Sequence, residues 1–174
     1  DGDLDLLVTN DQRTLVYINQ GSQFSDETNT RFPADNLGAF ATALLDVDLD
    51  GDIDFVNLGG MDMGGNFYRP QLFVNDGLGY FSKSQELVTP LAKAKNLTVG
   101  DFNGDGYPDV LVGEGTAYNS QGIAHQHVSL FLNQGGTLSL DANTESASWN
   151  VSDREWMAAD AGDFPTVSGR SAHV

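Results

Sequence analysis

Short runs of apolar residues, separated by segments rich in Asp, Asn and Gly, recur along residues 1–140. Runs of four to eight residues with many β-branched and aromatic side chains are typical of strands, and the apolar spacing of a helix is weak throughout. The clearest runs are 4–8, 14–18, 40–45, 53–56, 71–74, 96–100, 108–112 and 129–132. The pattern therefore predicts an all-β fold built from short strands.

These runs recur in one order. An acidic loop is followed by a strand, a polar stretch of varying length, a second strand, an Asn-x-Gly turn and a further apolar residue, and another apolar segment precedes each complete loop. The turns are 19–21, 75–77 and 133–135, and the apolar residues after them are Phe24, Phe81 and Leu138. Asp50 and Asp105 hold equivalent positions 55 residues apart. A period of this length predicts propeller blades or a solenoid, with four strands in each unit.

Two acidic loops, 46–54 and 101–109, share the spacing D-x-[DN]-x-D-G-x-x-D, and residues 1–5 match its last five positions. Side-chain oxygens at positions 1, 3 and 5 can converge on one ion, position 7 offers its carbonyl, position 9 completes the shell, and the glycine at position 6 permits the turn. Such oxygen donors favour Ca²⁺ over Mg²⁺, which demands tighter octahedral geometry. The predicted ligands are Asp46, Asp48, Asp50, Asp52 (carbonyl) and Asp54; Asp101, Asn103, Asp105, Tyr107 (carbonyl) and Asp109; and Asp1, Asp3 and Asp5 of the partial copy.

Two other interpretations of these loops are weaker. An EF-hand requires a Glu at position 12 and flanking helices, but position 12 is Asn57 or Val112 and strand-like runs follow both loops. Ordinary Asp/Gly turns are common between strands. Turn chemistry alone hardly accounts for five spaced oxygen donors around one glycine in two places.

The acidic loop, the following strand and the Leu-Phe-x-Asn-x-Gly-like turn together resemble the FG-GAP/VCBS repeats of integrin α-subunit-type β-propellers, most closely at 99–106. The resemblance covers most of residues 1–140 and implies a partial β-propeller of about three four-stranded antiparallel blades with calcium-binding loops. A closed ring typically has about four to eight blades, so further blades of the same parent chain are expected as partners. The predicted units are 1–38 (a partial first blade), 39–94 (second), 95–154 (third) and 155–174 (the degenerate or truncated start of a fourth).

The charge balance excludes several classes of protein. The chain has 25 acidic and 8 basic residues and a formal charge of −17, which disfavours contact with nucleic acid or anionic lipid. No apolar run approaches the roughly 20 residues that span a bilayer, so no membrane insertion is expected in this segment. The absence of cysteine excludes disulfides and cysteinyl metal sites.

Up-and-down connectivity places the acidic loops and the Asn-x-Gly turns at one end of each unit. The loops between the second and third strands, at Thr9–Arg13, Gly59–Pro70 and Gly113–His127, then lie at the opposite end, where we expect a protein or glycan ligand. Candidate contacts are Met61, Met63, Phe67, Tyr68, Arg69, Tyr118, His125 and His127. Alternatively the aromatic residues pack over a blade edge. His125 and His127 alternate along a strand and form either a transition-metal pair or ordinary surface histidines.

Three functions are compatible with this sequence. The first is a calcium-binding propeller segment of a larger extracytoplasmic protein, acting in adhesion or ligand recognition with calcium as a structural clamp. The others are the propeller part of a secreted carbohydrate-active enzyme and an architectural spacer. The chain has no G-x-S-x-G, H-E-x-x-H or P-loop motif, and calcium accounts for its carboxylate pairs, so we expect no enzymatic activity. Extracellular modules bind calcium at about 10⁻⁴–10⁻³ M, which predicts an extracellular, cell-surface or periplasmic location.

Overall fold

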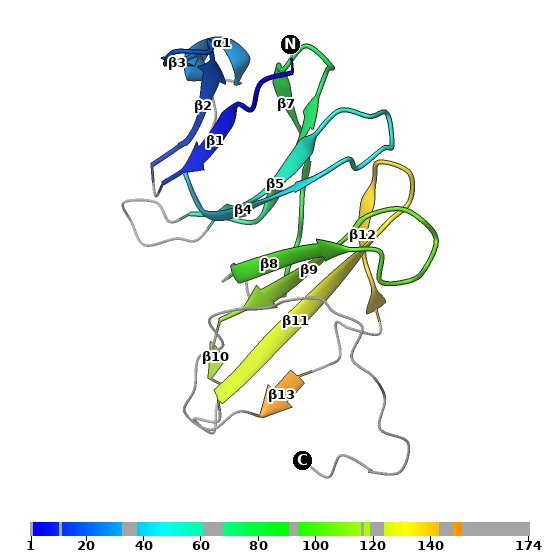
Figure 1. The fold of residues 1–174 in the computed structure, drawn as a ribbon. Coiled ribbons are helices and arrows are strands. Elements are labelled where there is room, and N and C mark those ends of the chain that lie inside the picture. Colours follow the sequence, from blue (N-terminus) through cyan, green and yellow to red (C-terminus); the bar gives the residue numbers. More distant parts are fainter. Residues whose placement is uncertain are drawn as a thin grey trace, which may run out of the picture.

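The computed structural model describes residues 2–10, 12–32, 38–60, 68–90, 94–115, 117–118, 124–142 and 148–150. For 117–118, 124–126 and 148–150 only the backbone is described. Within these ranges the chain forms strands in three antiparallel sheets and one single-turn helix, α1 (Thr28–Arg31) (Figure 1). The predicted all-β fold is therefore confirmed. The predicted fourth unit, 155–174, lies outside the described residues.

The first two sheets are simple meanders. The first has the order β1-β2-β3 and the second the order β4-β5-β6-β7, with every neighbouring pair antiparallel. The strands of the first sheet are β1 (Leu6–Thr9), β2 (Thr14–Asn19) and β3 (Phe24–Asp26). Those of the second are β4 (Ala39–Leu45), β5 (Asp54–Gly59), β6 (Gln71–Asn75) and β7 (Phe81–Glu86).

The third sheet repeats the four-stranded meander and adds two strands that the sequence pattern does not predict. Its meander is β8 (Ala94–Gly100), β9 (Asp109–Glu114), β11 (Ala124–Asn133) and β12 (Leu138–Leu140). The additional strands are β10 (Ala117–Tyr118) and β13 (Ser148–Asn150). They are possible because β11 is ten residues long and pairs with β9 only over Val128–Phe131, which leaves its first residues for β10 and β13. The loop predicted to run to His127 therefore ends earlier.

Each meander brings its acidic loop and its Asn-x-Gly turn to one end, as predicted. The loop 46–53 joins β4 to β5, the turn 76–80 joins β6 to β7, and the long segment 60–70 joins β5 to β6 at the other end. The acidic loop after β8 lies on the same side of the molecule as the loop after β4 (Figure 1). The apolar residues predicted to follow the turns begin β3, β7 and β12.

Different side chains join the sheets. Between the first and second sheets lies an aromatic cluster, in which the rings of Phe55 and Phe73 stack with their centroids 4.9 Å apart and Phe32 meets Phe55 edge-on at 5.5 Å. Between the second and third lies a cluster that is aliphatic apart from Phe131: Leu45, Val47, Val56, Leu58, Leu72, Leu87, Ala94, Val110, Val112, Phe131 and Leu138. All six residues of β5 are buried, since this strand has a neighbouring sheet on each face.

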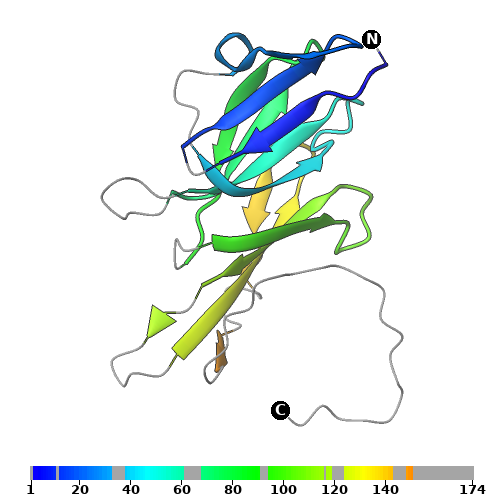
Figure 2. The same cartoon turned by 60° about the vertical axis from the view of Figure 1, so that its left-hand side comes forward.

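The three sheets follow one another along the chain and pack face against face, as adjacent blades of a propeller do (Figure 2). No ring is closed among the described residues. The arrangement is consistent with a partial β-propeller. No helix in the described part of the chain is long and apolar enough to cross a membrane.

Candidate metal centre

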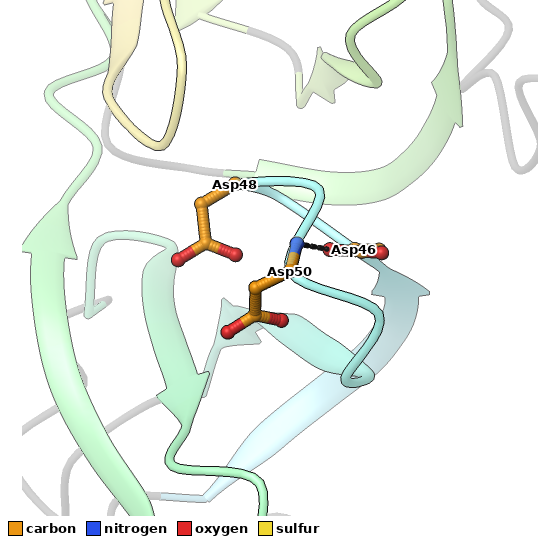
Figure 3. Close-up of side chains that lie close together, drawn as sticks. All are labelled: Asp46, Asp48 and Asp50. Atoms are coloured by element: carbon orange, nitrogen blue, oxygen red, sulfur yellow. Dashed lines mark hydrogen bonds between the residues drawn. The ribbon is translucent and has the colours of Figure 1, made fainter.

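The loop 46–54 brings three carboxylates together where β4 ends. One side-chain oxygen from each of Asp46, Asp48 and Asp50 lies within 4.8 Å of the others (Figure 3). Asp48 and Asp50 are exposed and Asp46 is partly exposed. The chain turns through two left-handed residues, Leu49 with φ 61° and Gly51 with φ 96°. This turn brings the side chains of alternate residues close together.

Backbone N–H groups organise these carboxylates. Asp46 accepts the N–H of Asp50 at Oδ1 (3.1 Å) and that of Gly51 at Oδ2 (3.0 Å). Asp50 accepts the N–H of Asp52 at Oδ1 (2.9 Å). The carboxylate of Asp52 lies against Gly77 of the neighbouring turn, where a Cβ atom would stand 2.6 Å from its Oδ2. Because the Asp52 carboxylate lies against this turn, the backbone carbonyl of Asp52 remains the predicted donor at position 7.

Asp54 occupies a different position from the three clustered acids. It is 1% exposed, and its two oxygens accept the N–H groups of Val47 (2.9 Å) and Asn75 (2.8 Å). Burial raises the pKa of the Asp54 carboxyl, and the nearby charges of Asp48 and Asp50 raise it further. Among the described residues, Asp54 lies outside the cluster and ties the acidic loop to the Asn-x-Gly turn.

The loop 101–109 follows the same plan with a denser set of hydrogen bonds. Asp101 accepts the N–H groups of Gly104 (2.7 Å), Asp105 (3.1 Å) and Gly106 (2.9 Å). These bonds, that from Gly106 above all, hold the pKa of the Asp101 carboxyl below its usual value. Asp105 accepts the N–H of Tyr107 at 2.9 Å. Backbone N–H groups thus hold the aspartates at the first and fifth positions of this loop, as they do in the loop 46–54.

Two further predicted ligands of this loop are engaged within the protein. The side chain of Asn103 accepts the N–H of Asp105 (2.9 Å), and its amide donates to Oδ2 of Asp105 (2.8 Å). Asp109 is fully buried and accepts the N–H groups of Phe102 (2.9 Å) and Asn133 (2.8 Å). Asp109 is therefore the counterpart of Asp54.

The partial copy at the start of the chain retains one part of this plan. Asp5 accepts the N–H of Asn19 at 2.8 Å, as Asp54 and Asp109 accept theirs. Asp3 is exposed, and the described acids of this copy form no cluster of three. Asp1 lies outside the described residues.

An asparagine clamp recurs at all three sites, where the sequence pattern predicts only a turn. Each asparagine donates its backbone N–H to the last aspartate of the acidic loop, and its side-chain oxygen accepts the N–H of a glycine in the turn. Its side-chain amide also donates to the carbonyl before that aspartate, at 3.1–3.3 Å. The residues are Asn19, Asn75 and Asn133. Their recurrence at the first position of each Asn-x-Gly turn was the available signal.

The donor set in the loop 46–54 suits a hard divalent cation. Three carboxylates with oxygens this close repel one another unless a cation neutralises them. The group offers oxygen donors alone, which Ca²⁺ binds in groups of six to eight at about 2.3–2.6 Å. Carboxylate oxygens of Asp46, Asp48 and Asp50 would supply three of these, and the carbonyl of Asp52 and water would supply more.

Comparison with known proteins supports the repeat. A family model for the FG-GAP-like repeat matches residues 1–57 and 58–112. The chain belongs to the FG-GAP-like repeat family. The boundary between the two matched FG-GAP-like repeats falls inside β5, so the sequence repeat is offset from the structural sheet. Comparisons with curated proteins and with solved structures give no match.

The predicted ligand-binding end is only partly described. The backbone N–H of Tyr68 donates to the carbonyl of Gly60 at 2.8 Å. Nη1 of Arg69 lies 3.7 Å from Oε1 of Glu86 and forms an ion pair with it. His127 is in β11, and its Nδ1 is buried without a hydrogen-bond partner in the described structure. Met61, Met63 and Phe67 lie outside the described residues, and Tyr118 and His125 are described by backbone alone.

Proposed function

We propose that this chain is a calcium-binding, non-enzymatic segment of a β-propeller in a larger extracytoplasmic protein. The observation that carries the proposal is the cluster of Asp46, Asp48 and Asp50, whose oxygens lie within 4.8 Å of one another in the acidic loop of an FG-GAP-like repeat. The equivalent hydrogen-bonded loop in the third sheet supports a second site of the same kind.

Calcium acts as a structural clamp in this proposal. The loop 46–54 carries five carboxylates, and Asp54 is held in the protein interior. An ion would offset the repulsion among these charges and fix the end of β4 against the start of β5. Both carboxylate oxygens of Asp46 and of Asp54 accept backbone N–H groups, which suits a role in holding an ion better than one in proton transfer.

The ligand of the parent protein binds at the opposite end from the calcium loops, in our proposal. There the segment 60–70 connects β5 to β6 and a second segment connects β9 to β11, and connections between strands commonly carry binding residues. The ligand is a protein or a glycan, and the activity is adhesion or recognition. Calcium sites with dissociation constants of about 10⁻⁴–10⁻³ M fill only outside the cytosol, which supports an extracellular, cell-surface or periplasmic location.

Isothermal titration calorimetry on chelator-treated protein tests the calcium site. We expect calcium to bind in the range given above and magnesium to bind more weakly. Asp50→Ala should remove one binding event, and Glu86→Gln, which removes an exposed charge outside the loops, should leave the isotherm unchanged. Calcium heats that are absent from the wild type, or equal losses in both variants, would refute the proposal. A turnover assay on polysaccharides with the parent chain checks the absence of catalysis.

A further inference from the structure

The acidic loop of the second sheet touches the Asn-x-Gly turn of the third. The side-chain amide of Asn133 donates to the carbonyl of Val47 at 2.6 Å, across 86 residues of sequence. Gly136 of the same turn lies against Asp48, where a Cβ atom would stand 3.2 Å from the Cβ of Asp48. In Figure 3 this turn is the yellow hairpin beside Asp48. The contact therefore joins a predicted ion-binding loop to a neighbouring sheet.

The same asparagine also belongs to the acidic loop of its own sheet. Asn133 is 1% exposed, and its backbone N–H donates to Oδ1 of Asp109 at 2.8 Å. Its side-chain amide reaches the carbonyl of Pro108 as well, at 3.1 Å. One buried side chain thus links the loop 101–109 to the loop 46–54.

The residue that accepts this bond, Val47, lies between two predicted ion ligands. Val47 is fully buried and separates Asp46 from Asp48. Its carbonyl accepts from Asn133, and its N–H donates to Asp54 at 2.9 Å. The two peptide units that flank the Val47 Cα are therefore each held by one hydrogen bond, and rotating either unit would break its bond and displace the adjoining aspartate. The position of Asn133 therefore bears directly on the geometry of the first three ion-ligand positions.

The equivalent asparagine of the second sheet, Asn75, has no corresponding acceptor, because the partial copy 1–5 contains only the last five positions of the motif and no counterpart of Val47. The amide of Asn75 donates to the carbonyl of Ile53 in its own sheet, at 3.3 Å, and makes no bond to another sheet within the described residues. Both asparagines tie an acidic loop to a turn, but only Asn133 connects two acidic loops. This difference provides a matched control.

We propose that the two acidic loops bind their ions cooperatively and that Asn133 transmits the coupling. This inference rests on the proposed calcium binding. An ion in the loop 101–109 orders Phe102, whose N–H donates to Asp109. Asp109 also accepts the N–H of Asn133, and the Asn133 amide in turn fixes the Val47 carbonyl. The ion that binds in the loop 46–54 then meets a loop that is already ordered, so its binding costs less conformational entropy of that loop. Coupling of this kind is reciprocal, so each ion raises the affinity of the other by the same factor.

Two glycine amides allow each loop to be followed separately by NMR. Gly51 and Gly106 both donate their N–H to the first aspartate of their own loop. In ¹⁵N-labelled protein, calcium titration should shift each signal with the isotherm of its own site. Asp105→Ala, which disables the loop 101–109, should weaken calcium binding reported by Gly51 at least about fivefold, the lower end of usual coupling factors. Asp50→Ala should weaken binding reported by Gly106 by the same factor.

The asparagine variants then test the route of the coupling. With Asn133→Ala as the background, Asp105→Ala should leave the affinity reported by Gly51 unchanged. With Asn75→Ala as the background, the full factor should remain. If Asn133→Ala does not fold, Asn133→Ser serves instead, because it keeps a polar group at this buried position but is one bond too short to reach the Val47 carbonyl.

Each result has a distinct meaning. If both glycines report calcium binding in the wild type and Asp105→Ala leaves the affinity at Gly51 unchanged, cooperativity is refuted while the proposed function stands. Coupling that survives the loss of the Asn133 side chain refutes its transmitting role. If calcium shifts neither glycine in the wild type, both this inference and the proposed function fail.

Discussion

The loops 46–54 and 101–109 share one spacing but differ in charge and in backbone strain. The first contains five carboxylates and the second contains three, with Asn103 and Tyr107 in place of two acids. At the fourth position the first loop holds Leu49 at φ 61°, where the second has Gly104 at φ 78°. A left-handed conformation costs a residue with a Cβ atom roughly 1–2 kcal/mol, and glycine avoids that cost. The first loop is therefore the less stable of the two without an ion.

The hydrogen bonds of the two loops also indicate that the loop 46–54 is the less stable of the two without an ion. Asp101 accepts three backbone N–H groups, and Asp46 accepts two. The third-sheet loop is organised by the protein itself, whereas the second-sheet loop gathers like charges that a cation must balance. The shared spacing thus predicts the same ligand positions in both loops. It does not predict that the stability of both loops depends equally on the ion.

The largest expected effect is that of calcium removal. Calcium at 100 times its dissociation constant stabilises the folded state by about 2.7 kcal/mol per site. Chelation should lower the melting temperature and increase hydrogen exchange at Gly51 more than at Gly106, because the second-sheet loop depends more on the ion. Thermal unfolding and exchange with and without chelator measure this. Equal increases at the two glycines would contradict the difference we draw between the loops.

A matched pair of substitutions comes next. Asp50→Asn and Asp105→Asn each remove one charge from the fifth position and keep an oxygen for the N–H two residues later. Both should lower the melting temperature in millimolar calcium. In chelator, Asp50→Asn should stabilise the protein by up to about 1 kcal/mol, since it relieves repulsion among clustered carboxylates, and Asp105→Asn should gain less. Chemical denaturation under both conditions decides, and equal gains in chelator would count against the comparison.

Backbone strain gives a smaller effect. Leu49→Gly should stabilise the chelated protein by less than about 1 kcal/mol, because relief of the left-handed conformation is partly offset by the greater entropy of glycine in the unfolded chain. Leu49 is 53% exposed, so little packing is lost. Gly104→Ala, the reverse change in the other loop, should destabilise the protein. If Leu49→Gly destabilises the protein as much as Gly104→Ala does, the two loops have the same backbone strain.

The smallest effect is on pH dependence without calcium. The pKa of Asp101 is lowered on folding, so its stabilising contribution is present above the unfolded value of 3.8 and is lost as pH falls through the lower folded pKa. The pKa of Asp54 is raised, so its charge opposes folding at neutral pH, and this cost disappears as pH falls through the raised folded pKa. Asp101→Asn should therefore flatten the acid limb of the unfolding free energy of calcium-stripped protein. An unchanged acid limb would contradict this assignment.

Local patterns in the sequence predicted much of the fold and of the site. The runs at 40–45 and 96–100 became β4 and β8, and the glycines at position 6 of both loops adopt the left-handed turn that the spacing requires. These features depend on neighbours in sequence, which a repeat displays directly. The pairing of β10 and of β13 with β11 does not depend on neighbours in sequence. It follows from the length by which β11 extends past β9.

Contacts between sheets were also beyond the sequence. Nothing near Asn133 or Val47 in the chain predicts the hydrogen bond between them, since it forms only when two sheets pack together. Likewise the burial of Asp54 and its raised pKa follow from its place beneath the Asn-x-Gly turn.

Crystallographic location of the ion is the most direct test of calcium binding at the loop 46–54. Crystals grown in excess calcium should show an anomalous peak bound by oxygens of Asp46, Asp48 and Asp50 at about 2.3–2.6 Å, with six to eight oxygen ligands in all. A loop that shows no peak at saturating calcium, or whose three carboxylates point away from an ion bound elsewhere, would contradict the account.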